Sequence, residues 1–204
     1  MHIALIGMSG IGKSAWAARL AAHGYALLDV DAAIARRVGE RVGRQLDDVY
    51  GLGAWMGLPY QRGYAAREAL FLAEELLLLE AALPQLEMPA PPMLLDLGGS
   101  AIYAGGSYFD RLRRSARIVY LAADHALLPA LITTYLAQPK PVVWDGAYRR
   151  WRGEPPQAAI ERCYPLLLAE RAARYAAIAD ITLPAALHRD PATTVPALLS
   201  AIGP

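Results

Sequence analysis

The sequence has a single cysteine and no excess of charge, and these absences exclude several classes of protein. Because Cys163 is alone, an internal disulfide framework is impossible, and a reducing cytosol is the expected compartment. The stretch IERCYPLLL around it predicts a buried structural thiol rather than a nucleophile. Lys and Arg number 20 against 19 Asp and Glu. We therefore expect no global field that attracts nucleic acid or an anionic membrane.

Long uninterrupted hydrophobic runs are also absent. The most apolar stretch, ALFLAEELLLLEAAL, carries three glutamates and is too short for a transmembrane span. The chain starts directly with the strand-like HIALIG, so no signal peptide is expected. Internal repeats, low-complexity linkers and coiled-coil patterns are not found. At 204 residues, we expect one domain over residues 1–204 that is cytoplasmic, monomeric and free of membrane.

Short apolar runs alternate with longer helical patterns along the chain. The runs predict strands over residues 2–7, 25–30, 92–98, 117–123 and 180–184. The patterns between them predict helices over about 13–23, 31–38, 62–83, 107–114, 125–136, 157–178 and 191–202. Because the strands lack polar alternation, we expect helices on both faces of a parallel sheet, which makes a three-layer α/β fold. Residues 137–157, rich in Pro, Gly, Trp and Arg, are expected to form a long surface excursion.

The stretch GMSGIGKS matches G-x-x-x-x-G-K-[ST], the P-loop pattern. An apolar strand precedes it and an amphipathic helix follows, which is the context that a phosphate-binding loop requires. A Gly-rich turn without a ligand is the alternative. The backbone is expected to cradle ATP phosphates, with the lysine reaching the β- and γ-phosphates and Ser14 providing a hydroxyl to Mg²⁺. The predicted nucleotide-binding residues here are Gly7, Ser9, Gly10, Gly12, Lys13 and Ser14.

Acidic residues end two of the predicted strands. Asp29 and Asp31 are one residue apart, so on a strand they point to the same face. Asp96 ends the third strand in MLLDLGG. Ligands of such sheets sit at the carboxyl ends of the strands, so we expect the three carboxylates near a Mg²⁺–nucleotide site, with Asp29 and Asp96 assisting the metal. Asp31 also fits a helix N-cap, and both roles remain open.

A second Gly-rich turn follows Asp96 directly. Gly98 and Gly99 lack side chains, so a small substrate can approach the backbone there. A tight turn into the next helix is the alternative.

With these motifs in place, the chain resembles the shikimate kinase family. The family's ordered features match DVDAAIARRVG, GRQLDDVYG, LGGS, KPVV, LAERAARYAAIADITL and HRDP, in addition to the P-loop. The resemblance runs over most of the chain. It implies a five-stranded parallel sheet in the order 2-3-1-4-5, and transfer of the ATP γ-phosphate to a hydroxyl of a small polyhydroxy acid.

The resemblance also implies roles for individual residues. Asp31 binds the acceptor hydroxyls and takes the proton, Arg171 holds the acceptor carboxylate, and Gly98 and Gly99 line the acceptor. The acceptor-binding helices fall at about 31–83, and a mobile lid at about 137–157. In the lid, Lys140 or one of Arg149, Arg150 and Arg152 neutralises charge on the transferring group. Arg189, in the HRDP loop, flanks adenine.

Four departures from the family bear on the acceptor. The family has Phe-Arg three residues ahead of a Glu on the substrate helix, and this Arg is a second carboxylate clamp. GYAAREALF offers Tyr64, Ala65 and Glu68 in those places, so Arg62 or Arg67 is the candidate substitute. The third Gly of the turn is Ser100, the lid Arg is Lys140, and two segments, YGLGAWMGLPYQRGY and the lid, are longer.

These departures leave the acceptor open. The aromatics Trp55, Tyr60, Trp144, Tyr148 and Trp151 either line a larger acceptor pocket or anchor the longer lid. A kinase for gluconate, nucleosides or nucleotides, with Arg171 and Arg174 facing the acceptor, remains an alternative. So does a nucleotide-binding regulator without turnover.

Overall fold

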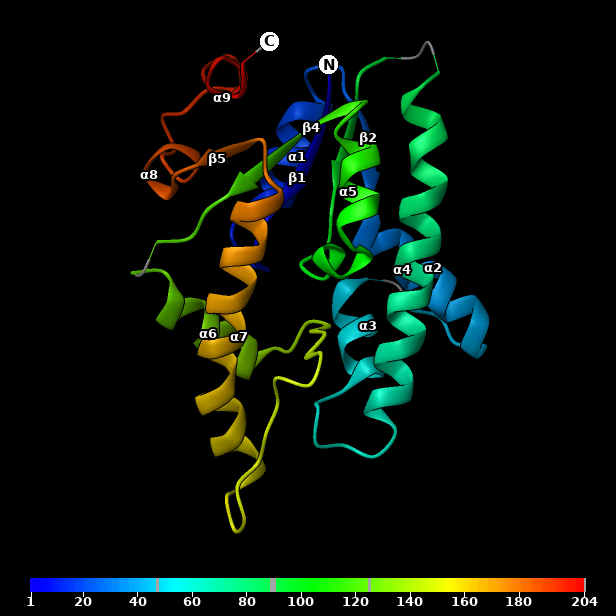
Figure 1. The fold of residues 1–204 in the computed structure, drawn as a ribbon, viewed down its shortest axis with the longest axis vertical. Coiled ribbons are helices and arrows are strands. Elements are labelled where there is room, and N and C mark those ends of the chain that lie inside the picture. The colour runs from blue at the N-terminus through cyan, green and yellow to red at the C-terminus, as the bar shows by residue number, and fades with distance from the viewer. Residues whose placement is uncertain (47, 89–90, 125, 204) are drawn as a thin grey trace.

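The computed structural model describes residues 1–46, 48–88, 91–124 and 126–203. Its sheet is parallel throughout, with the strand order β2-β3-β1-β4-β5 that the family resemblance implied (Figure 1). The strands are β1 (His2–Ile6), β2 (Ala26–Asp29), β3 (Met93–Asp96), β4 (Ala116–Leu121) and β5 (Ile181–Leu183). Each predicted strand is present, so the alternation of short apolar runs and helical patterns was a sound guide.

The helices follow the predicted order with three additions. They are α1 (Lys13–Ala21), α2 (Val30–Val42), α3 (Val49–Met56), α4 (Tyr64–Leu86), the 3₁₀ helix η1 (Ala101–Ala104), α5 (Gly106–Leu112), α6 (Leu128–Ala137), α7 (Pro156–Ile178), α8 (Ala185–His188) and α9 (Val195–Ile202). The short helices α3, η1 and α8 were not predicted, and α9 begins later than expected. Position 125, at the predicted start of α6, and position 47, in the GRQLDDVYG match, lie outside the described residues.

Alternate residues of the central strands point into two separate cores. On β1, Ala4 and Ile6 belong to the core under α2, α4, α5 and α7. Their neighbours Ile3 and Leu5 belong to the core under α1 and α9. Both faces of the inner strands are therefore covered, which explains why these strands read as continuous apolar runs and confirms the three-layer architecture.

The edge strand β2 departs from this pattern. Residues 26, 27 and 29 are exposed, and Leu27 keeps 43% of its surface accessible. The prediction of strands covered on both faces is therefore wrong for β2, because apolar composition alone does not distinguish an edge from an inner position.

The strand β2 ends at Asp29, and α2 begins at the next residue. The Asp29 carboxylate accepts a hydrogen bond from the Ala32 amide over 2.9 Å, so it is the N-cap of α2. The expectation that Asp29 and Asp31 share a strand face is therefore wrong, and so is the N-cap role considered for Asp31. Instead, Asp31 lies in the first turn of α2.

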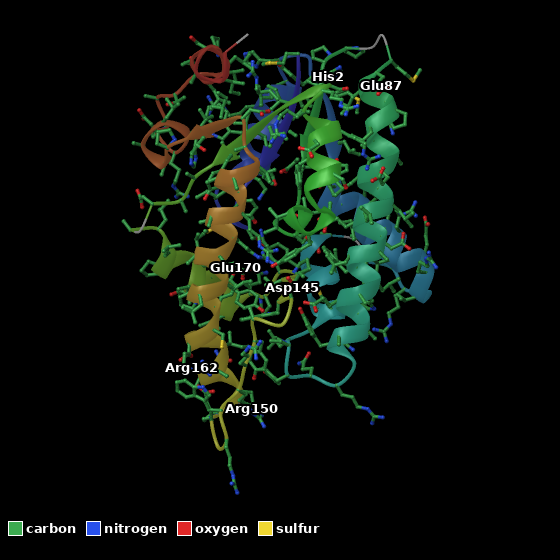
Figure 2. The ribbon with its side chains drawn as sticks, viewed as in Figure 1. His2, Glu87, Asp145, Arg150, Arg162 and Glu170 are labelled. Carbon is green, nitrogen blue, oxygen red and sulfur yellow. The ribbon has the colours of Figure 1, made fainter. Side chains whose placement is uncertain are left out.

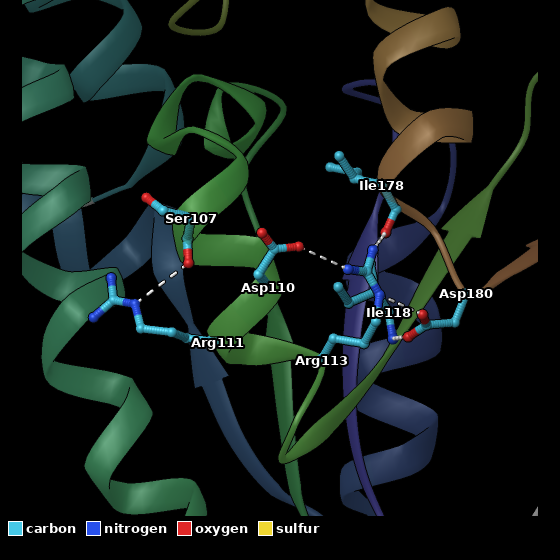
Figure 3. A network of polar contacts seen from close by, with 7 residues as sticks. All are labelled: Ser107, Asp110, Arg111, Arg113, Ile118, Ile178 and Asp180. Atoms are coloured by element: carbon cyan, nitrogen blue, oxygen red, sulfur yellow. Dashed lines mark hydrogen bonds and ion pairs between the residues drawn. The ribbon is translucent and has the colours of Figure 1, made fainter.

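A polar network fixes α7 and β5 to the amino end of the sheet (Figure 3). Arg113 donates to the Asp180 carboxylate over 2.8 Å and to the Ile178 carbonyl over 2.8 Å. Asp180 also accepts from the Ile118 amide over 2.9 Å. The A-D pair at the end of the R-x-x-x-Y-x-x-x-A-D motif thus has a structural role, which sets the position of α7 relative to the sheet.

The loop between α6 and α7, residues 138–155, is the lid segment, and it runs between α7 and α4 (Figure 1). Its residues Val142, Val143 and Trp144 are buried. Tyr64 on α4 donates to the Val142 carbonyl over 2.6 Å, and Glu68 accepts from the Trp144 amide over 2.5 Å. Residues 142–144 of the lid segment are therefore packed into the molecule, while residues 149–153 are exposed. Across the part of the chain that is described, no helix combines the length and apolarity needed to cross a membrane.

Candidate active site

The P-loop lies between β1 and α1, at the carboxyl edge of the sheet. Gly7 has φ +145°, and a Cβ there would lie 2.8 Å from the Leu121 carbonyl oxygen of β4. Gly12, the N-cap of α1, has φ +110°. L-residues with side chains rarely adopt either conformation. The loop shape therefore depends on glycine, which agrees with the phosphate-binding motif.

Lys13 is buried beneath this loop. Its amine donates to the carbonyls of Gly7 over 3.0 Å and Met8 over 3.1 Å. Burial lowers the pKa of Lys13, and the nearby carboxylates of Asp96 and Asp31 oppose this change. The positive charge that the acidic residues require is thus provided first by Lys13.

Asp29, Asp96 and Ser14 lie together beside the lysine. Asp29 and Asp96 are register partners on the adjacent strands β2 and β3. Burial raises the pKa of Asp96, and the nearby Lys13 charge and Ser14 hydroxyl oppose this rise. A serine hydroxyl beside a strand-end carboxylate fits Mg²⁺ held by the hydroxyl and phosphates, with carboxylates acting through water. The described residues contain no group of three or more His, Cys, Asp or Glu side chains that could hold a metal by itself.

Asp31 faces the first of the two glycines that follow β3. A Cβ on Gly98 would lie 2.6 Å from Asp31 Oδ1 and 3.1 Å from Glu75 Oε1. Burial raises the pKa of Asp31 to about 6, and the charges of Lys13 and Lys140 limit the rise. Asp31 is therefore a carboxylate at neutral pH with a raised proton affinity, which suits it to accept a proton from a hydroxyl.

Glu75 on α4 is a site residue that the sequence reasoning missed. It is 2% exposed and accepts a hydrogen bond from the Ser100 hydroxyl over 2.8 Å. Burial raises its pKa to about 8, although the Ser100 hydroxyl lowers it. Glu75 is therefore largely protonated at neutral pH. Ser100, predicted to narrow the glycine turn or to add a hydroxyl contact, provides that contact to Glu75.

The position of Glu75 offers a second way to match the substrate helix to the family's pattern. The spacing of the family's Phe-Arg-x-x-Glu occurs twice on α4, at Tyr64, Ala65 and Glu68 and again seven residues later. The second occurrence is Phe71, Leu72 and Glu75, and this Glu faces Asp31 and Gly98. Glu68 instead binds the lid segment. The second occurrence of this spacing could have been recognised in the sequence. It puts Leu72 at the position where the family's pattern has its arginine.

Arg171 on α7 completes this cluster. Its guanidinium is buried, donates to the Val143 carbonyl over 2.5 Å, and would lie 3.4 Å from a Cβ on Gly99. Its Nε–H has no hydrogen-bond partner. Tyr175 donates to the Gly99 carbonyl over 2.6 Å and holds the glycine turn against α7. Arg171 therefore faces the glycine turn with unused hydrogen-bonding capacity.

Lys140 and Arg189 lie at a pocket of about 220 Å³ beside the P-loop. Ser9 and Gly10 form part of its wall. The charge of Lys140 also affects the pKa of Lys13, of Asp31 and of Asp96. The structure thus brings both predicted residues to the nucleotide side of the site.

Two predicted residues are not brought to the cluster. Arg67 donates to the carbonyls of Met56 and Arg62, so it fastens the loop between α3 and α4. Arg149 is exposed, and its carbonyl accepts from Arg162 and Cys163 near the start of α7. Figure 2 shows the neighbouring Arg150 at the far end of the lid segment, away from the strands. The local sequence around Arg67 and Arg149 does not reveal that both residues lie away from the carboxyl edge of the sheet.

Two of the extra aromatic residues of the lid segment, Trp144 and Tyr148, belong to a packed cluster. Trp144 is 1% exposed and contacts Tyr148 and Tyr164 at centroid distances of 5.7 Å. Trp151 lies outside this cluster, where the Arg162 guanidinium stacks on its ring. These contacts favour the interpretation of Trp144 and Tyr148 as anchors of the lid segment.

The fold and the P-loop define this chain as a protein with the fold of P-loop small-molecule kinases. A model of the AAA domain family matches residues 3–81, which contain the P-loop and the first two strands. A search of curated protein sequences found no match.

Among solved structures, shikimate kinases share the fold, which confirms the resemblance predicted from the motifs. The enzyme from Bacteroides thetaiotaomicron aligns with a TM-score of 0.55 and 18% identity over 95% of this chain and 91% of that chain. The enzyme from Acinetobacter baumannii, solved in complex with shikimate, aligns with a TM-score of 0.55 and 19% identity over 89% of this chain and 82% of that chain. The enzyme from Aquifex aeolicus vf5 aligns with a TM-score of 0.52 and 17% identity over 91% of this chain and 87% of that chain.

Proposed function

We propose that the protein transfers the γ-phosphate of Mg²⁺-bound ATP to a hydroxyl of a small polyhydroxy acid, shikimate or a related compound. The observation that carries this proposal is the placement of Lys13 and Asp31 close enough for each charge to act on the other, with Arg171 near the same glycine turn. A phosphate-binding cation and a proton acceptor thus share one edge of the sheet.

Each group has a distinct part in the proposed transfer. Lys13 and Lys140 neutralise charge on the transferring phosphoryl group. Ser14 and Asp96 would hold Mg²⁺, which would supply further charge neutralisation. The acceptor oxygen forms a bond to the γ-phosphorus as the bond to the β,γ-bridging oxygen breaks. Asp31 takes the hydroxyl proton, and Arg171 orients the acceptor through its carboxylate.

A coupled assay of ADP release with Mg²⁺-ATP tests the proposal directly. Wild-type protein is compared with and without shikimate, with Lys13→Ala as the blank and the exposed Arg114→Gln as the control for a lost surface charge. Shikimate-dependent turnover that is lost only in Lys13→Ala supports the proposal. If shikimate has no effect, gluconate, other hydroxylated acids and nucleosides are tested. Silence across this panel with intact ATP binding contradicts the proposal and favours a nucleotide-binding regulator.

A further inference from the structure

The resemblance to shikimate kinases implies a second arginine clamp on the substrate helix, and neither Ala65 nor Leu72 of α4 can provide it. Leu72 lines a small cavity together with Glu75 and Tyr103. Arg67 is fastened to its own loop. If the acceptor carries a carboxylate, a second guanidinium must therefore come from another element.

Tyr103 of η1 marks where such a cation lies. The Arg171 guanidinium is 5.6 Å from the centroid of the Tyr103 ring, and the Arg174 guanidinium is 5.1 Å from it. The two arginines are three residues apart on α7, so they are neighbours on one face of the helix. Both cations thus converge on the aromatic ring that also borders Leu72 and Glu75.

A carboxylate from the lid segment already approaches Arg174. Asp145 Oδ2 lies 3.9 Å from Arg174 Nη2, and the same nitrogen pairs with Glu170 Oε1 of α7 at 2.5 Å. Figure 2 shows Asp145 on the lid segment and Glu170 on the neighbouring α7. Asp145 has φ +46°, the only positive φ of a non-glycine residue in the described part of the chain. The adjacent Val143 carbonyl accepts from Arg171, so one short stretch of the lid segment contacts both arginines.

We infer that Arg174 is the second guanidinium of the acceptor site, and that an acceptor carboxylate displaces Asp145 of the lid segment to bind between Arg174 and Arg171. This inference rests on the proposed function and names the acceptor as a carboxylate. The planar fork of arginine matches a carboxylate in two parallel hydrogen bonds. The unpartnered Nε–H of Arg171 supplies one donor. Arg174, which pairs with Glu170 within its own helix and lies farther from Asp145, supplies the others.

The inference predicts opposite effects from two substitutions. Arg174→Gln removes the cation. Asp145→Asn removes the competing charge of the lid segment, leaves the Glu170 pair of Arg174 in place, and preserves the backbone, because asparagine tolerates positive φ. Arg114→Gln, an exposed arginine next to the network at the amino end of the sheet, is the control for net charge. Thermal unfolding of each full-length variant checks that the fold is intact.

Calorimetric titration of these variants with shikimate, quinate and gluconate, each compared with its uncharged methyl ester, measures the preference for a carboxylate. We expect wild-type protein to bind at least one acid more tightly than its ester. Arg174→Gln should reduce that preference about 10-fold, as expected for a half-exposed arginine. Asp145→Asn should tighten binding of the acid a few-fold without affecting the ester, and Arg114→Gln should match wild type.

Several results would overturn the inference. These are an unchanged preference in Arg174→Gln, and no preference for any acid in wild-type and Asp145→Asn protein. Arg174-dependent binding of AMP without such dependence for the acids would also overturn it. Turnover of an ester with ATP would preserve the proposed kinase function while refuting the carboxylate site. Acid binding that depends on Arg174 without any phosphate transfer would preserve the site and refute the kinase function.

Discussion

The two halves of the site are built in different ways. The core of the nucleotide half is continuous in sequence, because Gly7 to Gly12 connect β1 to α1, and Lys13 and Ser14 begin that helix. The acceptor half combines Asp31 of α2, Glu75 of α4, Gly98 after β3 and Arg171 of α7. The nucleotide half follows the P-loop sequence pattern, whose glycines are required by the conformation of the local backbone. The second half depends on how four distant elements pack, so its chemistry is free to change while the nucleotide half stays fixed.

The largest effect that separates the halves is expected from Asp31→Asn. Because asparagine cannot take the acceptor proton, turnover should fall about 10²-fold or more, while ATP affinity stays within about 2-fold of wild type. The wild-type rate should rise with pH through about 6 as Asp31 loses its proton, and this limb should vanish in the variant. Steady-state kinetics from pH 5 to 8, with nucleotide binding measured separately, provide the check. Loss of ATP binding would show that the two halves are not separable.

Glu75→Gln is expected to change how stability depends on pH. The pKa of Glu75 is raised from 4.5 to about 8, so the folded protein keeps a proton that the unfolded chain releases. Stability should therefore fall as the pH rises from about 5 to 8, by about 2–4 kcal/mol in total. Glutamine remains neutral and retains an oxygen for the Ser100 hydroxyl, so the variant should have a flatter profile. Urea unfolding at several pH values measures this difference, and parallel profiles would contradict it.

Gly98→Ala is expected to affect the acceptor half alone. The added Cβ would lie 2.6 Å from Asp31 Oδ1, so the carboxylate must move, and the acceptor KM should rise about 10-fold. Gly106→Ala is the matched control, because a Cβ there meets nothing within 4 Å. Kinetics with varied acceptor and varied ATP test the prediction. An increase of the ATP KM alone would contradict it.

The smallest effect is expected from Arg67→Gln, which tests the role first predicted for this residue. Its hydrogen bonds go to the Met56 and Arg62 carbonyls, so the variant should lose about 1 kcal/mol of stability or less. The acceptor KM should stay unchanged. A rise in that KM comparable to the effect of Gly98→Ala would return Arg67 to the acceptor site.

Much of the fold and of the nucleotide half was determined by the sequence itself. The five apolar runs, the glycines of the P-loop with Lys13, and the strand-end Asp96 act through local rules of backbone conformation and burial. These rules depend on neighbours in the chain, so they can be recognised without a structure. The sheet order was implied by the family resemblance and is confirmed by the structure.

Tertiary packing alone decided which residues form the acceptor half. The spacing that identifies the substrate glutamate occurs twice on one helix, and only the packing of α4 against α2 and the glycine turn selects Glu75 over Glu68. Asp29 caps α2, so β2 ends one residue earlier than predicted and Asp31 lies in the first turn of the helix instead of beside Asp29 on a strand face. Contacts between segments far apart in sequence stabilise both arrangements, and these contacts cannot be predicted from a local sequence pattern.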